Sequence, residues 1–217
     1  MRTSEVFALT WDDIDFEEGT IFIQHSVYNK PKDHLGRWFL GSTKTISGTR
    51  KIYMSDTLKK ALLNYKDRQD YLKLIYESQY KYYHLEDVKN EYGKVVENRI
   101  VINTKDEEKL NLIFTKDDGT YIGTDILKYP FKIIHNELKI NSRFYDLRGT
   151  YATKILNNGT ELKDVANILG HSNVITTENY YIRSLSDNRR NATEIADKVI
   201  NSQVINNVIE FKVGESV

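Results

Sequence analysis

The stretch Leu169-Gly-His-Ser-Asn-Val-Ile-Thr-Thr-Glu-Asn-Tyr-Tyr181 carries the most information in this chain, because it sets His171 nine residues before Tyr180. Two arginines lie far upstream, one in Arg2-Thr-Ser-Glu5 and one in Tyr145-Asp-Leu-Arg148. Arginines can hold a phosphate by paired hydrogen bonds, a histidine can donate a hydrogen bond or a proton, and a phenol can attack phosphorus. Together these residue types suit cleavage of a phosphodiester through a covalent tyrosine intermediate, which points to DNA as the substrate.

The composition predicts a packed domain without cofactors. The chain has 217 residues, of which 40% are hydrophobic and 29% charged, which fits one large domain or one domain with an appendage. No run of about 18 apolar residues and no secretory signal pattern is present, so we expect a cytoplasmic protein without a membrane span. The absence of cysteine excludes thiolate metal sites, and the five histidines lack metal-ligand spacing. We therefore expect no metal and no other cofactor.

The charges are unevenly distributed, although the formal net charge is zero. A zero net charge argues mildly against binding to nucleic acid. However, segment 128–154 holds six lysines and arginines against two acidic residues, whereas segment 84–98 holds four acidic residues against two lysines. A basic cluster on a helix is more often a solvated face than a phosphate-binding surface. Here the motifs beside it favour a basic working face and an acidic outer face.

The N-terminal half alternates between helical and strand patterns. Residues 4–9 predict a short helix, residues 11–15 a turn, and three segments rich in β-branched and aromatic residues predict strands at 20–28, 38–43 and 49–54. Ser55 is a candidate N-cap for a long helix over about 56–83. The six tyrosines of that stretch are more often packing residues than a platform for stacking bases.

The C-terminal half is predicted to be mainly helical. Residues 84–109 are polar with weak periodicity, which favours a variable insertion, and residues 112–115 predict a short strand. Helices are expected at about 124–138, 146–157, 161–169, 173–180 and 187–201, with Gly159 and Gly170 as C-terminal caps. The predicted class is α+β and mostly α-helical, with a helical bundle and a small three-stranded antiparallel sheet.

The motifs Arg2-Thr-Ser-Glu5, Tyr145-Asp-Leu-Arg148 and Leu169 to Tyr181, called boxes below, resemble in this order those of the catalytic domain of the tyrosine recombinase (phage integrase) family. The resemblance runs from Arg2 to about Arg183. Its most specific part is Leu-Gly-His-Ser followed by Thr-Thr and a tyrosine, and the Asp-Leu-Arg box with its following Thr-Tyr-Ala-Thr is moderately specific. The opening box adds Leu9, Trp11 and Asp13-Ile-Asp15. Each box alone could arise by chance, whereas the ordered set could hardly do so.

The resemblance assigns roles to individual residues. Tyr180 matches the nucleophile, which would form a 3′-phosphotyrosine and free a 5′-hydroxyl, and Tyr181 is its weaker competitor. Arg2 and Arg148 match the two phosphate-binding arginines, whose planar forks can neutralise the transition state. His171 matches a hydrogen-bond donor to a non-bridging oxygen. For any of these residues taken alone, a packing or surface role is the more common one.

Two further residues complete the predicted site. Lys44 matches the lysine of a hairpin between two strands and could protonate the departing 5′-oxygen as a general acid. Arg50 and Lys51 lie close enough in sequence to compete for that role. Tyr145 departs from the family, which more often has histidine three residues before the second arginine. Its phenol can donate a hydrogen bond to phosphate but buffers poorly near pH 7, and a packing role is equally compatible with its position.

The domain limits also follow from the resemblance. We expect a catalytic domain over residues 1–201 that is N-terminally truncated, with its insertion near 84–109. The family's N-terminal DNA-clamping (core-binding) domain is absent from this chain. Residues 202–217 form a C-terminal tail, in which 204–213 are a candidate segment for exchange between neighbouring protomers. A self-packed or disordered tail is equally compatible with the sequence.

The predicted function is that of a site-specific recombinase, integrating or excising a phage or mobile element. It would act on double-stranded DNA as a homotetramer, with DNA-bending or excision factors as candidate further partners, in the bacterial nucleoid. One alternative is a type IB-like topoisomerase, which would relax plasmid without site preference. The other is a non-catalytic DNA-binding accessory protein, which the Tyr145 departure favours and the full set of site residues opposes.

Overall fold

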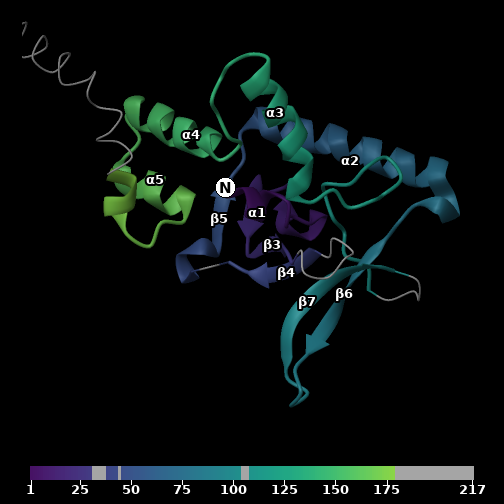
Figure 1. The fold of residues 1–217 in the computed structure, drawn as a ribbon. Helices are drawn as coiled ribbons and strands as arrows, with labels where there is room; N and C mark the ends of the chain where they lie inside the picture. The colour runs from purple at the N-terminus through teal and green to yellow at the C-terminus, as the bar shows by residue number, and fades with distance from the viewer. Residues whose placement is uncertain (31–37, 44, 104–107, 179–217) are drawn as a thin grey trace, which may run out of the picture.

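The structure, a computed structural model, describes residues 1–30, 38–43, 45–103 and 108–178. They form an α+β fold of several helices and two small antiparallel sheets (Figure 1), as predicted for the class. In chain order, with η for a 3₁₀ helix, the elements are α1 (Thr3–Val6), η1 (Trp11–Asp13), β1 (Ile14–Asp15), β2 (Thr20–Ile23), β3 (His25–Asn29), β4 (Trp38–Ser42), η2 (Ile46–Gly48), β5 (Arg50–Tyr53), α2 (Asp56–Tyr76), η3 (Glu77–Gln79), β6 (Tyr83–Lys89), β7 (Val95–Ile102), η4 (Thr124–Leu127), α3 (Lys128–Asn136), α4 (Asp146–Asn157) and α5 (Leu162–Leu169).

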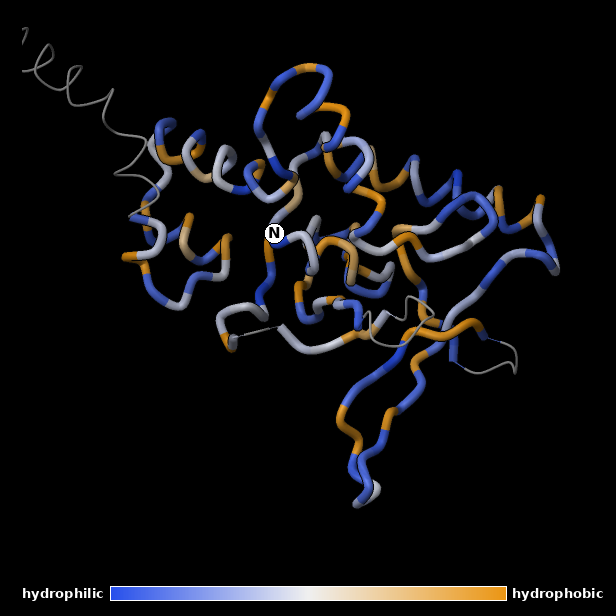
Figure 2. Tube along the Cα trace, in the orientation of Figure 1, coloured by the Kyte–Doolittle hydropathy of each residue, from blue (hydrophilic) through white to orange (hydrophobic). Residues whose placement is uncertain are grey.

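The first sheet has three strands in the order β1-β2-β5. Ile21 of β2 pairs with Ile14 on one side and with Ile52 on the other. Leu62 and Tyr65 of α2 pack against the core cluster that this sheet shares with the segment after α1. Hydrophobic and hydrophilic residues alternate along α2 in Figure 2, as expected for a helix with one face on a core.

The predicted strand over residues 20–28 is in fact two strands in two different sheets. The strand is interrupted at Gln24, whose Nε2 donates a hydrogen bond to Asp13 Oδ1 at 2.8 Å. Beyond this break β3 enters a second, four-stranded sheet in the order β3-β4-β7-β6. Both halves carry strand-forming residues, so the pattern of β-propensity does not reveal the break.

The segment 84–109, predicted as an insertion of weak periodicity, contributes a regular β-hairpin. β6 and β7 pair antiparallel and extend away from the body of the molecule (Figure 1). The turn between them is held by Asn90 Oδ1, which accepts hydrogen bonds from the backbone N–H groups of Tyr92 and Lys94. Most of the hairpin is exposed or half-buried. A strand exposed on both faces lacks the alternation that sequence patterns detect.

Helix α2 ends at Tyr76, earlier than the predicted end near residue 83. Its start is as predicted, since Ser55 Oγ accepts a hydrogen bond from the backbone N–H of Leu58 at 3.2 Å. After α2 the side chains of Tyr80 and Tyr83 become buried in the core. The free energy gained by burying two aromatic rings outweighs the helix propensity of these residues, which would otherwise extend α2.

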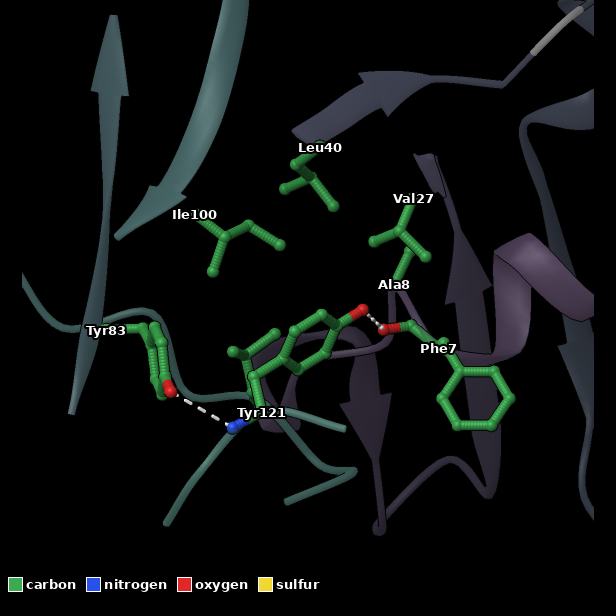
Figure 3. Packing of buried hydrophobic residues seen from close by; sticks show 8 residues of the cluster. Phe7, Ala8, Val27, Leu40, Tyr83, Ile100 and Tyr121 are labelled. Carbon is green, nitrogen blue, oxygen red and sulfur yellow. Dashed lines mark hydrogen bonds between the residues drawn. The ribbon is translucent and has the colours of Figure 1, made fainter. Parts of the chain in front are cut away.

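The core next to α1 fixes the position of that short helix (Figure 3). Tyr121 donates a hydrogen bond from its hydroxyl to the carbonyl oxygen of Phe7 at 2.8 Å, and its backbone N–H donates to the hydroxyl of Tyr83 at 3.1 Å. Burial raises the pKa of Tyr121, so its hydroxyl stays protonated and remains a donor. Val27 and Leu40 pack in the same cluster. A four-residue helix is thereby held by tertiary contacts.

The C-terminal helices lie at one end of the molecule, where α5 packs beside β5 (Figure 1). The helices predicted at 146–157 and 161–169 are confirmed as α4 and α5, and the one predicted at 124–138 is divided into η4 and α3. Gly159 and Gly170 end α4 and α5 with positive φ, as predicted for caps.

The remaining predictions concern residues 112–115 and the C-terminal part of the chain. The strand predicted at 112–115 is reduced to single β-bridges at Leu112 and Thr115. The last helix of the described chain begins at Val174, close to its predicted start, whereas the predicted helix 187–201 and the tail 204–213 lie outside the described residues. In the part of the chain that the structure describes, no helix is long and apolar enough to cross a membrane.

Candidate active site

Residues from four elements meet where the C-terminal end of α5 faces α1, α4 and β5. Arg2 stands at the N-cap of α1, and Arg148 lies in the first turn of α4. His171 follows the cap of α5, and Arg50 opens β5. Three arginines and a histidine, distant in sequence, thus share one small region of the fold.

The buried carboxylate of Glu5 binds two of these three arginines. It accepts hydrogen bonds from the backbone N–H of Arg2 at 2.7 Å and from Arg2 Nη1 at 2.6 Å. Arg50 Nη2 and Nη1 donate to its two oxygens at 2.9 and 3.2 Å. Burial alone would raise the pKa of Glu5, but the hydrogen bonds from Arg50 and Arg2 lower this pKa to about 2. Glu5 is therefore an anion at neutral pH, and it holds both guanidinium groups.

Three consecutive carbonyl oxygens at the end of α5 each accept a hydrogen bond from a different arginine. Arg50 Nε donates to Ile168 at 2.8 Å, Arg148 Nη2 to Leu169 at 2.5 Å, and Arg2 Nη2 to Gly170 at 3.2 Å. The last carbonyl groups of a helix have no partner within the helix and form the negative end of its dipole. The arginines satisfy them and so fix the turn that carries His171.

Gly170 allows this close approach. Its φ is +69°, a left-handed conformation that side chains rarely adopt. A Cβ atom at this position would also lie 2.8 Å from both Arg50 Nη1 and the carbonyl oxygen of Ser47. Glycine is therefore required here for its conformation and for the space it leaves.

His171 is held by a buried hydroxyl group. Its Nδ1 lies 2.7 Å from Oγ1 of Thr177, which is fully buried. Burial, and then the charges of Arg148, Arg2 and Arg50, lower the pKa of His171 to about 4. The ring is therefore neutral at pH 7. Either group of this pair can be the donor. If the Thr177 hydroxyl donates to Nδ1, the ring proton sits on Nε2, which makes this nitrogen a hydrogen-bond donor.

An open cleft of about 370 Å³ lies above this framework. Arg148 is 7% exposed and lines the cleft, and its Nη1 finds no hydrogen-bond acceptor among the described residues. Burial and the charge of Arg2 lower the pKa of Arg148, but a guanidinium remains charged at neutral pH. A buried cationic donor without an acceptor is costly unless an anion binds it. The other residues that line the cleft are Arg143, Tyr145, Asp146, Gly149, Thr150 and His171.

The structure brings four of the six predicted site residues together. Arg2, Arg148 and His171 belong to the framework, and Tyr145 lies at the rim of the cleft, where its side chain is 39% exposed. Lys44 and Tyr180 lie outside the described residues, as does Tyr181.

Sequence patterns gave Arg50 only as a competitor of Lys44 for the general-acid role, and Thr177 only as part of the Thr-Thr pair, so neither was predicted to hold other site residues. Two partners of Arg50, Glu5 and Ile168, are 45 and 118 residues away in sequence, so no local pattern reports them. One signal was present, because strand alternation sets Arg50 on the same, less exposed face as Ile52. For Thr177, the signal was its place in the Thr-Thr pair after His171.

Comparison with known proteins agrees with this arrangement. Residues 1–187 match the model of the phage integrase family, so the chain belongs to that family. It is 28% identical over 200 residues to a tyrosine recombinase XerC-like protein of Caldanaerobacter subterraneus subsp. tengcongensis, a match that covers 89% of this chain and 45% of that protein. It is 26% identical over 182 residues to tyrosine recombinase XerC of Pediococcus pentosaceus, covering 83% and 44%. The chain thus spans about half the length of these relatives.

Among solved structures, the fold is similar to the integrase of transposon Tn1549 in complex with a circular intermediate DNA. The TM-score is 0.58 at 22% sequence identity, and the match covers 90% of this chain and 54% of the integrase chain. The same integrase in complex with transposon right end DNA gives a TM-score of 0.55. At this identity the likeness establishes the fold.

Proposed function

We propose that this chain is the catalytic domain of a site-specific recombinase that cuts and rejoins double-stranded DNA through a 3′-phosphotyrosine intermediate. The observation that carries the proposal is the buried Arg148, which lines a cleft together with His171 and whose Nη1 has no acceptor in the part of the chain that the structure describes. Membership of the phage integrase family supports the same reaction. The scissile phosphate is the anion that this donor would receive.

The framework suits stabilisation of a phosphorane transition state. Negative charge grows on the non-bridging oxygens as the nucleophile adds, and preorganised donors stabilise that charge most when they need no rearrangement. Arg148 is fixed by its bond to Leu169, and Arg2 by its bonds to Glu5 and Gly170. In this proposal Arg148 Nη1, Arg2 and His171 Nε2 donate to the non-bridging oxygens.

The nucleophile and the acid in this proposal are Tyr180 and Lys44. The Tyr180 oxygen forms a bond to phosphorus as the bond from phosphorus to the 5′-oxygen breaks, and Lys44 supplies the proton that the 5′-oxygen takes up. Tyr180 is chosen because it stands three residues after Thr177, which contacts His171, in the motif that begins at Leu169. Thr43 and Thr45 flank Lys44, and the Thr43 hydroxyl donates to the carbonyl oxygen of Thr45 at 3.1 Å. Rejoining is the reverse reaction.

Tyr145 takes the place where the family more often has histidine. Its position at the N-cap of α4, at the rim of the cleft, supports a hydrogen bond from its hydroxyl to the DNA phosphate. A phenol can donate this bond but cannot act as a cation near pH 7. In this proposal Lys44 therefore carries out the acid–base catalysis, and Tyr145 contributes to binding of the DNA phosphate.

The partners follow from the same proposal. Recombination joins two duplexes, so we infer a tetramer on DNA in which each protomer supplies one Tyr180. The Tn1549 integrase, whose fold is similar, was solved with DNA of a transposon. This likeness supports DNA of a phage or mobile element as the substrate.

A plasmid assay tests the proposed function. A supercoiled plasmid carrying two copies of the cognate site is incubated with the full-length protein and with Tyr180→Phe. Recombined circles with the wild-type protein alone are expected. Relaxation without any preference for the site would instead indicate a topoisomerase, and binding without any change in the plasmid would indicate an accessory protein.

A further inference from the structure

Arg50 has no contact with the cleft, yet it contacts the groups that hold the cleft residues. Its side chain is 7% exposed, and each of its three nitrogens donates to protein. Nη2 and Nη1 bind the carboxylate of Glu5, Nη1 also donates to the carbonyl oxygen of Gly48 at 2.7 Å, and Nε donates to that of Ile168. Four of the five N–H groups of this guanidinium thus donate to described protein atoms, and Arg50 is not among the residues that line the cleft.

Two of the partners of Arg50, Glu5 and Ile168, also contact or adjoin the residues that are proposed to bind the phosphate. Glu5 holds Arg2 through two hydrogen bonds. Ile168 begins the run of three carbonyl oxygens that Arg148 and Arg2 complete, and His171 follows directly after this run. Displacing Arg50 would therefore disturb Arg2 and the His171 turn together.

Arg50 also joins the hairpin loop before β5 to this turn. The carbonyl oxygen of Gly48 accepts from Arg50, and that of Ser47 lies against Gly170. Gly48 itself packs against Thr43, since a Cβ atom there would lie 2.6 Å from Thr43 Cβ. These contacts tie residues 47 and 48 to the turn that carries His171.

We propose that Arg50 is a positioning residue for DNA cleavage, which acts through Glu5, Arg2 and the His171 turn and does not touch the substrate. This inference rests on the proposed function. A planar guanidinium is needed, because only a fork can bind both carboxylate oxygens and a carbonyl oxygen on a third side at once. Lysine at this position keeps the charge and loses that geometry.

The test compares the rate of covalent adduct formation on a nicked suicide duplex for the full-length wild type, Arg50→Lys, Arg50→Gln and Glu5→Gln. Arg68→Gln is the matched control, because Arg68, on α2, forms an exposed ion pair with Asp117. Each protein is assayed at saturating DNA after its DNA affinity and its melting temperature have been measured. If Arg50→Gln does not fold, the rate of Arg50→Lys alone is compared with that of the wild type.

A second substrate separates positioning from a general loss of structure. It carries a methylphosphonate at the scissile position, which removes one negative non-bridging oxygen and with it part of the need for the arginines. We expect Arg50→Lys to keep its DNA affinity and to cleave the ordinary phosphate about tenfold to a hundredfold more slowly, the range expected for small misplacements. On the methylphosphonate its deficit relative to wild type should shrink.

Two results would overturn the inference. One is an unchanged rate in the folded Arg50 variants, and the other is an equal deficit on both substrates, which indicates a purely structural ion pair. A wild-type protein that binds the duplex but forms no adduct contradicts the proposed function itself, and the inference fails with it.

Discussion

Arg148 donates to the carbonyl oxygen of Leu169 at 2.5 Å through Nη2, while its Nη1 has no acceptor among the described residues, and the Arg148 side chain lines the cleft. One half of the guanidinium is therefore fixed to the end of α5, and the other half keeps a donor that no described residue satisfies. Because the turn after α5 also carries His171, this bond sets two proposed phosphate ligands relative to each other. A rigid pair of donors is the arrangement that electrostatic catalysis requires.

Replacing Arg148 should slow cleavage far more than it weakens DNA binding. Arg148→Ala removes both the fixed donor and the partner of Leu169, and loss of one preorganised donor costs about 2.7–4 kcal/mol of barrier. We expect adduct formation at saturating DNA to fall by about 100-fold to 1000-fold. Single-turnover kinetics measure this rate, and a rate close to that of the wild type would remove Arg148 from the site.

His171 should titrate well below an ordinary histidine. Burial and the three arginines lower its pKa to about 4, so the ring should be neutral at pH 7 with its proton on Nε2. Nitrogen NMR of labelled histidine reports both the pKa and the tautomer. Thr177→Val removes the hydroxyl at Nδ1 and should mix the tautomers. A titration near pH 6.5 would contradict this environment.

The bound anion provides a further check on His171. Phosphate in the cleft would offset the positive charge of the arginines, so DNA binding should raise the pKa of His171 from its value in the free protein. The same NMR titration, repeated with DNA bound to Tyr180→Phe, measures the shift. No change on binding would indicate that the phosphate lies elsewhere.

Glu5 should make the protein sensitive to acid. Its pKa in the folded state is about 2, below the ordinary 4.5, so the unfolded chain binds more protons between these values. The stabilisation is fully present above pH 4.5 and is lost as the pH falls toward 2. Urea unfolding at several pH values measures this loss.

A pair of variants isolates the contribution of Glu5. Glu5→Gln should remove its part of the pH dependence, whereas Glu18→Gln, at an exposed ion pair with Lys51, should leave the dependence almost unchanged. Equal pH profiles for wild type and Glu5→Gln would show that the buried carboxylate contributes nothing to acid stability.

Gly170→Ala and Gly159→Ala form a matched pair at two helix ends. Both positions have positive φ, at +69° and +90°, but only the Cβ atom at Gly170 would meet other atoms within 4 Å, those of Arg50 and Ser47. Backbone strain costs about 1–3 kcal/mol in each. The loss of unfolding free energy should be larger in Gly170→Ala, and only this variant should lose cleavage. Equal losses in both assays would show that close packing at Gly170 is unimportant.

The local parts of the fold were predictable from sequence. α4 and α5 were found because Gly159 and Gly170 mark their ends and apolar residues recur at helical spacing. The β6–β7 hairpin was missed, because its partner strand β4 lies far away in sequence and its faces are largely exposed. The split at Gln24 was missed because β-propensity is equal on both sides of it.

The site divides in the same way. Arg2, Arg148 and His171 were predicted from local motifs, and the structure brings them together at the end of α5. The role of Arg50 depends on Glu5 and Ile168, which only the folded chain places beside it. Motifs therefore identify groups that would face the substrate, whereas the residues that hold those groups emerge from tertiary structure.

Covalent trapping tests the central claim most directly. A nicked suicide duplex carrying the cognate site is incubated with the full-length protein, with Tyr180→Phe and with Tyr181→Phe, and the products are separated on a denaturing gel. We predict a protein–DNA adduct for the wild type and for Tyr181→Phe, and none for Tyr180→Phe. If all three proteins bind the duplex and none forms an adduct, the transesterase account is contradicted and a DNA-binding accessory role takes its place.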